Sequence, residues 1–281
     1  MGGDPAPNRA LRSNNALPNQ PPSAYKVFTE IRASLLSNDR TEVEVRNLPS
    51  SIGSIVFDAL SEDKDVEERL PRMTYDAHTS TFFARNMPTK IHDVPQMWLS
   101  NEISKMQAAK FLSDDERDNF DTTVGTTFND FVAPYTNSRK EPDWALIPIT
   151  DKLPSVVLES GWSDNWPKLL QAMRLWLEGG RPNVQLVFLF NWGKRTNNSV
   201  AGEVRVYERT LPGATNERFR ASIFPIPQGG PGGIPLTRAE MFGVSGVLPG
   251  RNATDRWHLS LTRLREIADR WVRAMGLTPV S

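Results

Sequence analysis

Two short apolar runs on either side of one polar turn constrain the fold of this chain more than any other feature. The first run follows Asp143, and the second ends at Glu159. Between them lies Thr150-Asp151-Lys152, whose residue types favour a turn. An antiparallel hairpin centred on Asp151 places Asp143 and Glu159 opposite each other, because both are equally far from that centre along the chain.

Carboxylates at these two positions predict a metal site. Two carboxylates a few ångströms apart repel each other, and a hard divalent cation relieves that repulsion. We therefore expect Asp143 and Glu159 to bind Mg²⁺ or Mn²⁺. An amphipathic helix is predicted from Pro167 to Leu177 and carries Lys168 in its first turns. Asp143, Glu159 and Lys168 are the candidate catalytic residues.

The same residues also have structural interpretations. Asp143 follows a proline, a position typical of a turn or of the start of a strand. Glu159 needs a partner, since an unpaired carboxylate is costly to bury, and a cation or Lys168 can supply one. Lys168 can equally be a solvated lysine on the helix surface. The residues alone leave these interpretations open.

Hydrophobic periodicity predicts the remaining elements. The run at 184–190 is almost continuously apolar and favours a central strand buried on both faces, whereas the alternation at 203–209 favours a strand towards the sheet edge. Ser113 opens a capping-box pattern, which predicts a short helix after it. Further helices are predicted at 25–36, 94–112 and 259–275, two short strands within 73–87, a strand at 122–132 and a loop at 228–234.

Composition excludes several classes of site. The chain has no Cys and three His, so thiolate chemistry is excluded and a His-rich zinc site is disfavoured. Its longest apolar run is too short to span a bilayer, and no secretory signal pattern opens it. These features predict an intracellular protein, cytoplasmic or nuclear, without a membrane partner.

The 281 residues are expected to form one domain at 23–281, preceded by a disordered tail at 1–22 that is rich in Pro and Asn. Formal charge is unevenly distributed. Residues 181–281 carry 14 Lys and Arg against 7 Asp and Glu, while the whole chain carries 33 of each kind. Such an asymmetry permits a basic surface for nucleic acid, although charges in sequence halves can mix in space.

Four blocks of the sequence resemble the PD-(D/E)XK nuclease-like superfamily, and more narrowly a group of uncharacterised fungal proteins within it. The resemblance implies an α/β (mixed α+β) fold with a restriction-endonuclease-like core, in which helices flank a central mixed sheet and carboxylates bind magnesium. The blocks are Tyr75-Asp76 with Phe82 to Pro88 and His92; Lys140-Glu141-Pro142-Asp143-Trp144; Glu159 to Asp164 with Lys168-Leu169 and Trp176-Leu177; and Ile234-Pro235-Leu236 with Met241-Phe242-Gly243.

The chain departs from the superfamily pattern at two positions. The usual lysine two residues after the acidic residue is Gly161 here, and Ala172 stands where the fungal proteins often carry Asp. Lys168 can replace the missing lysine from the helix. The upstream acidic residue of the superfamily corresponds to Asp93 or Glu102. The resemblance implies a metal-dependent nuclease that hydrolyses phosphodiester bonds in nucleic acid; the alternative is an inactive nuclease fold that serves as a binding or scaffolding module.

Overall fold

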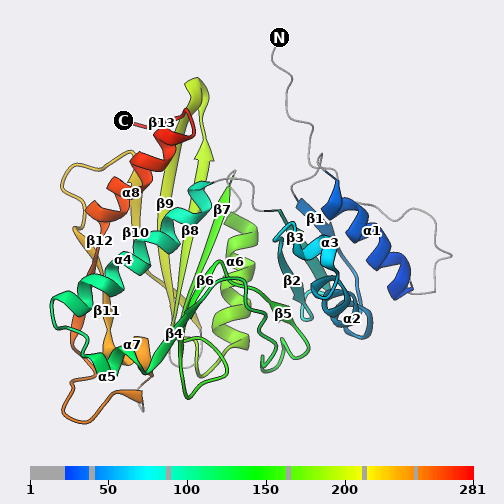
Figure 1. The fold of residues 1–281 in the computed structure, drawn as a ribbon, viewed down its shortest axis with the longest axis horizontal. Coiled ribbons are helices and arrows are strands. Elements are labelled where there is room, and N and C mark those ends of the chain that lie inside the picture. The colour runs from blue at the N-terminus through cyan, green and yellow to red at the C-terminus, as the bar shows by residue number, and fades with distance from the viewer. Residues whose placement is uncertain (1–22, 38–41, 87–89, 163–165, 211–213, 244–245) are drawn as a thin grey trace. The chain divides into compact units, whose positions relative to one another are not determined.

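A computed structural model describes most of the chain (Figure 1). Its contacts group the chain into two compact units, which the prediction of one domain at 23–281 did not anticipate. Unit 1 comprises residues up to Pro88 and Thr127–Glu141, and unit 2 comprises Thr89–Thr126 and Pro142–Ser281. The predicted tail at 1–22 lies outside the described residues. These are 23–37, 42–86, 90–162, 166–210, 214–243 and 246–281.

Unit 1 packs three helices with an antiparallel sheet whose strand order is β1-β3-β2-β5. The predicted helix at 25–36 and the predicted strand pair within 73–87 are confirmed as α1 and as β2 with β3. The elements are α1 (Ala24–Leu36), β1 (Glu42–Val45), α2 (Ser50–Ser61), α3 (Lys64–Glu67), β2 (Arg72–Asp76), β3 (Thr81–Arg85) and β5 (Arg139–Lys140).

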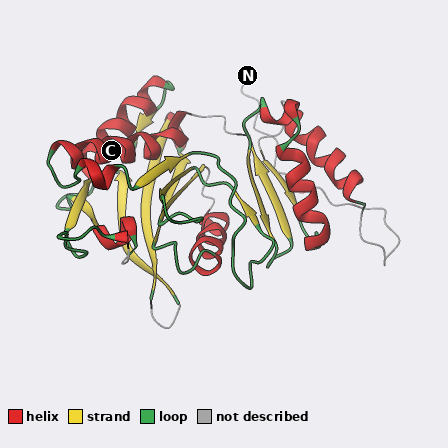
Figure 2. Cartoon of the chain, turned by 60° about the horizontal axis from the view of Figure 1, so that its bottom comes forward, coloured by secondary structure: helices red, strands yellow, loops and turns green. Residues whose placement is uncertain are grey.

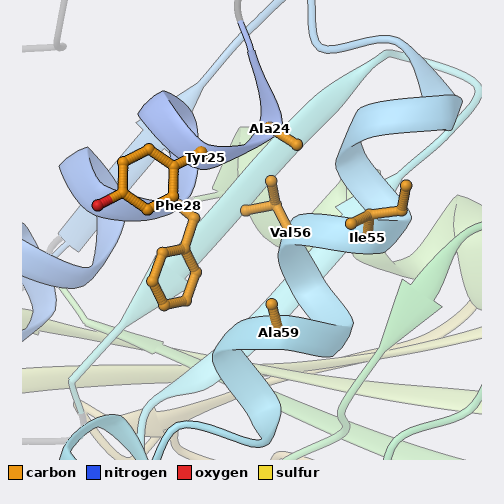
Figure 3. A pocket seen from close by; sticks show the side chains of 6 residues that line it. All are labelled: Ala24, Tyr25, Phe28, Ile55, Val56 and Ala59. Atoms are coloured by element: carbon orange, nitrogen blue, oxygen red, sulfur yellow. The ribbon is translucent and has the colours of Figure 1, made fainter.

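The α1 helix forms because its apolar residues recur on one face. Val27, Ile31 and Leu35 are spaced by four residues and all are buried in the core of unit 1. The Ser23 side chain accepts a hydrogen bond from the Lys26 backbone N–H and caps the helix. Between α1 and α2 lies a shallow apolar pocket of about 220 Å³ (Figure 3). It is lined by Ala24, Tyr25, Phe28, Ile55, Val56 and Ala59.

Unit 2 contains a mixed sheet with the strand order β10-β9-β8-β7-β6-β4, and β13 pairs with β9. β7 and β8 are parallel, whereas β4, β6 and β7 form an antiparallel series. The strands are β4 (Phe120–Thr123), β6 (Trp144–Pro148), β7 (Val156–Trp162), β8 (Leu186–Lys194), β9 (Ser199–Arg209), β10 (Thr215–Phe224) and β13 (Thr278–Pro279).

Helices flank this sheet, as the mixed α/β prediction expected (Figure 2). The predicted capping box at Ser113 is present and starts α5. A separate antiparallel pair joins β11 (Gly233–Thr237) and β12 (Arg256–Ser260). The helical elements are η1 (Lys90–Asp93), α4 (Val94–Ala108), α5 (Asp114–Arg117), α6 (Trp166–Arg174), the π-helical turn η2 (Leu175–Gly179), η3 (Thr196–Asn198), α7 (Arg238–Phe242) and α8 (Leu261–Ala274).

The sheet of unit 2 has two differently built faces. Side chains on alternate strand positions, such as Leu158, Phe188 and Phe190, pack with Trp98 of α4 and with α8 in the main core. We call this the α8 face. The strand residues that alternate with these side chains, such as Gly161, point to the opposite face and towards α6, where Leu169 lies against Gly161. We call this the α6 face.

Two predicted strands differ from the observed ones. The strand predicted at 122–132 is wrong beyond Thr123, because Gly125 adopts a left-handed φ of 69° and the following segment joins unit 1. The strand predicted at 184–190 begins at Leu186 and extends to Lys194. It extends because β9 pairs with it along this whole length, so that polar Asn191 is included in the sheet.

Candidate metal site on the α6 face

The hairpin register follows the predicted symmetry. β6 and β7 pair through Trp144 with Leu158, Ala145 with Val157, and Leu146 with Val156. Every pair is centred on residue 151, the predicted midpoint of the hairpin. The recorded pairing ends at Trp144 with Leu158, and just before β6 the Asp143 backbone N–H donates to the Leu158 carbonyl at 3.2 Å. The strand–turn–strand prediction is therefore confirmed in its register.

Asp143 is held where β6 begins. Its side chain is 5% exposed, and Oδ2 accepts a hydrogen bond of 2.6 Å from the backbone N–H of Ser160. A short bond from an N–H to a carboxylate is a strong, charge-assisted contact. The strand that carries Glu159 thus also fixes the position of the Asp143 carboxylate.

Glu159 lies within β7 and is 4% exposed. Its Oε1 accepts a hydrogen bond of 2.7 Å from the indole N–H of Trp176. Trp176 is fully buried and lies in η2, where the helix widens from α to π geometry. The sequence predicted a regular helix from Pro167 to Leu177; the observed α6 ends at Arg174, and the π-helical turn carries the residue that bonds Glu159.

Gly161 lets α6 pack closely against β7. A Cβ at this position would lie 3.1 Å from Cδ1 of Leu169, which is tighter than ordinary van der Waals contact. α6 therefore packs directly on the strand at Gly161, and Leu169 fills the volume that a longer side chain needs. A side chain at this position requires Leu169 to shift by a few tenths of an ångström.

Lys168 lies half-buried in the first turn of α6. Two residues earlier, the Trp166 ring is stacked by the Arg205 guanidinium of β9, whose centre lies 3.6 Å from the ring centroid. Two residues of helix turn the side-chain direction by about 200°. The Cα–Cβ bonds of Trp166 and Lys168 therefore leave the helix axis in roughly opposite directions.

The two upstream acidic candidates have different surroundings. Glu102 of α4 is fully buried in contact with the α8 side, where it accepts a hydrogen bond of 2.8 Å from Trp257 Nε1 and forms an ion pair with Arg263. Its carboxylate is thus used to tie α4 to α8 and β12. Asp93 is exposed at the end of η1.

Sequence reasoning missed Asn191. It lies in β8 directly beside Gly161 of β7 and beside Glu203 of β9. Its side chain is 5% exposed. The available signal was a single amide inside the series VFLFNW, but the strand was predicted to end at Phe190, one residue before Asn191.

The described residues hold no group of three or more His, Cys, Asp or Glu placed to bind one metal ion. Ser163 and Asp164, which belong to the block around Glu159, lie outside the described residues. Among the described helices none is long and apolar enough to cross a membrane. Comparisons with models of protein families, with curated proteins and with solved structures find no match.

Proposed function

We propose that the protein is a metal-dependent, nuclease-like hydrolase that cleaves phosphodiester bonds in nucleic acid with Mg²⁺ or Mn²⁺. The observation that carries this proposal is a pair of buried carboxylates at the paired strands β6 and β7: Asp143, immediately before β6, is 5% exposed and Glu159, within β7, is 4% exposed. Two buried carboxylates close together concentrate negative charge, which a divalent cation neutralises. The resemblance to the PD-(D/E)XK superfamily and its restriction-endonuclease-like core belongs to the same proposal.

The donor set fits magnesium. Mg²⁺ keeps several waters and is commonly held by one or two carboxylates together with substrate phosphates, so that two protein carboxylates suffice. Asp143 and Glu159 are the residues that hold it. A divalent ion at this place activates water and stabilises the charge that develops on the scissile phosphate.

The remaining residues position the site. Trp176 and the Ser160 backbone donate hydrogen bonds to Glu159 and Asp143, and these bonds fix the carboxylate orientations. Lys168 of α6 supplies an ammonium group that orients the attacking water or neutralises the phosphate. The basic excess of residues 181–281 supplies charge for nucleic-acid binding.

A second candidate function is a binding module on an inactive nuclease fold. The observation in its favour is Gly161, because Leu169 occupies the place of the usual lysine. In this case Glu159 and Lys168 form a structural ion pair, and no metal binds. The two candidates therefore predict opposite behaviour of the same variants.

Calorimetric titration with Mn²⁺, followed by cleavage assays on single-stranded DNA, double-stranded DNA and RNA, distinguishes them. For the hydrolase, Asp143→Asn and Glu159→Gln abolish metal binding and cleavage with little loss of stability, because each removes a ligand charge without changing shape. Exposed Asp121 of β4 provides the control, and Asp121→Asn leaves both properties unchanged.

Lys168→Ala distinguishes the hydrolase from the inactive binding module most clearly. For the hydrolase it lowers the cleavage rate and leaves the Mn²⁺ affinity unchanged, since an ammonium group is no metal ligand. For the inactive module it leaves a buried carboxylate uncompensated and costs about 3–5 kcal/mol of stability. Lys152→Ala, in the exposed hairpin turn, is the matched control. A wild-type protein that binds no Mn²⁺ would contradict the hydrolase.

A further inference from the structure

Asn191 faces the same side of the sheet as Glu159. Its strand neighbours Phe190 and Trp192 belong to the core on the α8 face, so Asn191 points to the α6 face. Glu159 and Gly161 pair with Leu189 and Asn191 of the adjacent parallel strand. Asn191 therefore lies two residues beyond Leu189, the residue that pairs with Glu159, on the same face of the sheet.

The Asn191 amide oxygen is a buried acceptor that the protein leaves unused. Its Oδ1 is shielded from solvent and accepts no hydrogen bond from the residues that the structure describes. Buried polar atoms of native proteins almost always have a partner, and an exception calls for an unrecorded water or ion. Here the acceptor lies beside the strand segment that carries a candidate metal ligand.

Gly161 leaves this oxygen without a side-chain neighbour at the paired position. In the superfamily pattern that position carries a lysine, whose ammonium group is a donor suited to an amide oxygen. In this chain the glycine provides no donor, and Leu169, which packs over it, is apolar. The partner of Asn191 Oδ1 must therefore come from elsewhere.

We infer that Asn191 is the third protein ligand of the metal site, binding a divalent cation through its amide oxygen together with Asp143 and Glu159. Amide carbonyls are hard oxygen ligands of the kind that Mg²⁺ and Mn²⁺ accept. Two carboxylates and one neutral amide carry a charge of about −2, which one divalent ion balances. This inference rests on the proposed hydrolase and adds a residue that the superfamily pattern does not supply.

The test is the Mn²⁺ dissociation constant, measured by calorimetry on the full chain, with the metal-dependent rise in melting temperature as a second readout. Asn191→Ala removes the oxygen and is expected to weaken Mn²⁺ binding about 10–100-fold, as loss of residues that orient or complete metal sites commonly does. Asn216→Ala changes an exposed asparagine of β10 and is expected to bind Mn²⁺ like the wild type.

Asn191→Asp keeps the shape, adds a ligand charge and is expected to bind Mn²⁺ more tightly than the wild type. It decides the question if Asn191→Ala does not fold, and an unchanged dissociation constant for it then overturns the inference. If Asp143→Asn loses Mn²⁺ binding while Asn191→Ala keeps the wild-type constant, the inference fails and the proposed function stands. If the wild type binds no Mn²⁺, both fail.

Discussion

The two faces of the unit 2 sheet each bury a glutamate against a tryptophan indole, yet they balance its charge differently. On the α8 face, Glu102 accepts a hydrogen bond from Trp257 and forms an ion pair with Arg263. On the α6 face, Glu159 accepts one from Trp176, and a second buried carboxylate, Asp143, accepts a hydrogen bond from the backbone of the next residue, Ser160. The donor to the glutamate is an indole on both faces, whereas the second charged group is an arginine on one face and a carboxylate on the other.

This difference separates a structural contact from a candidate binding site. One carboxylate beside one arginine is close to neutral, and the pair ties α4 to α8 across a packed interface. Two carboxylates that lie close together repel each other, and a bound cation relieves that repulsion. If the proposed metal binds, it stabilises the second arrangement and leaves the first unchanged, and perturbing each face in turn tests this expectation.

The largest stability effect is expected on the α8 face. Arg263→Ala leaves the fully buried Glu102 without its cation and should lower the free energy of unfolding by about 3 kcal/mol, at the lower end for a buried pair because Arg263 is itself 31% exposed. Urea denaturation measures this loss. Arg270→Ala, at an exposed position of the same helix, should change stability by less than about 0.5 kcal/mol. Equal effects of the two variants would show that the pair is not structural.

An intermediate effect is expected from Trp176→Phe on the α6 face. The substitution removes the indole donor to Glu159, a hydrogen bond to a charged group that contributes about 1.5–3 kcal/mol. A double-mutant cycle with Glu159→Gln isolates the coupling between the two side chains. Saturating Mn²⁺ should restore part of the stability of Trp176→Phe. A coupling energy near zero would contradict the role assigned to Trp176.

The smallest effect concerns a buried carboxyl outside this sheet, Glu141 in unit 1, whose pH dependence provides a reference for both faces. Burial raises the pKa of Glu141, although its hydrogen bonds from the Met73 N–H and Thr127 hydroxyl oppose that rise. The folded state therefore binds its proton more tightly than the unfolded state does. The stability that this proton contributes is complete below the ordinary glutamate pKa and is lost as pH rises through the raised folded pKa.

Glu141→Gln mimics the protonated form and should remove this pH dependence. Melting temperatures between pH 4 and pH 8 measure it, and the variant should gain relative to the wild type as pH rises. Glu67→Gln, at an exposed position of α3, should follow the wild-type pH profile. A wild-type stability that rises through the same window because of Glu141 would contradict the raised pKa.

The turn between β6 and β7 and the start of α5 could be predicted because residues close together in the sequence determine them. The register of β6 and β7 follows from the position of the polar turn, and the capping box at Ser113 starts α5 where its pattern occurs. Glu159 lies in a strand as the sequence predicted, whereas Asp143 lies immediately before β6 and not within it. The helix at 94–112 is confirmed as α4, with its end earlier than predicted at Ala108.

Contacts between residues far apart in the sequence could not be predicted from hydrophobic periodicity. Glu102 and Arg263 are 161 residues apart, so no local periodicity indicates that they pair. Residues 127–141 return to unit 1 because β5 pairs with β2, which the strand prediction at 122–132 could not foresee. Asn191 was missed for the same reason, since only pairing with β9 shows that β8 continues beyond Phe190.

The division into two units gives each its own spectroscopic signature. All eight tryptophans of the chain fall between Trp98 and Trp271 and belong to unit 2, whereas unit 1 contains none. Tryptophan emission therefore follows the unfolding of unit 2 alone, while far-ultraviolet circular dichroism follows both units. If the two signals change at the same denaturant concentration, the units unfold as one cooperative system; if they separate, unit 1 has a stability of its own.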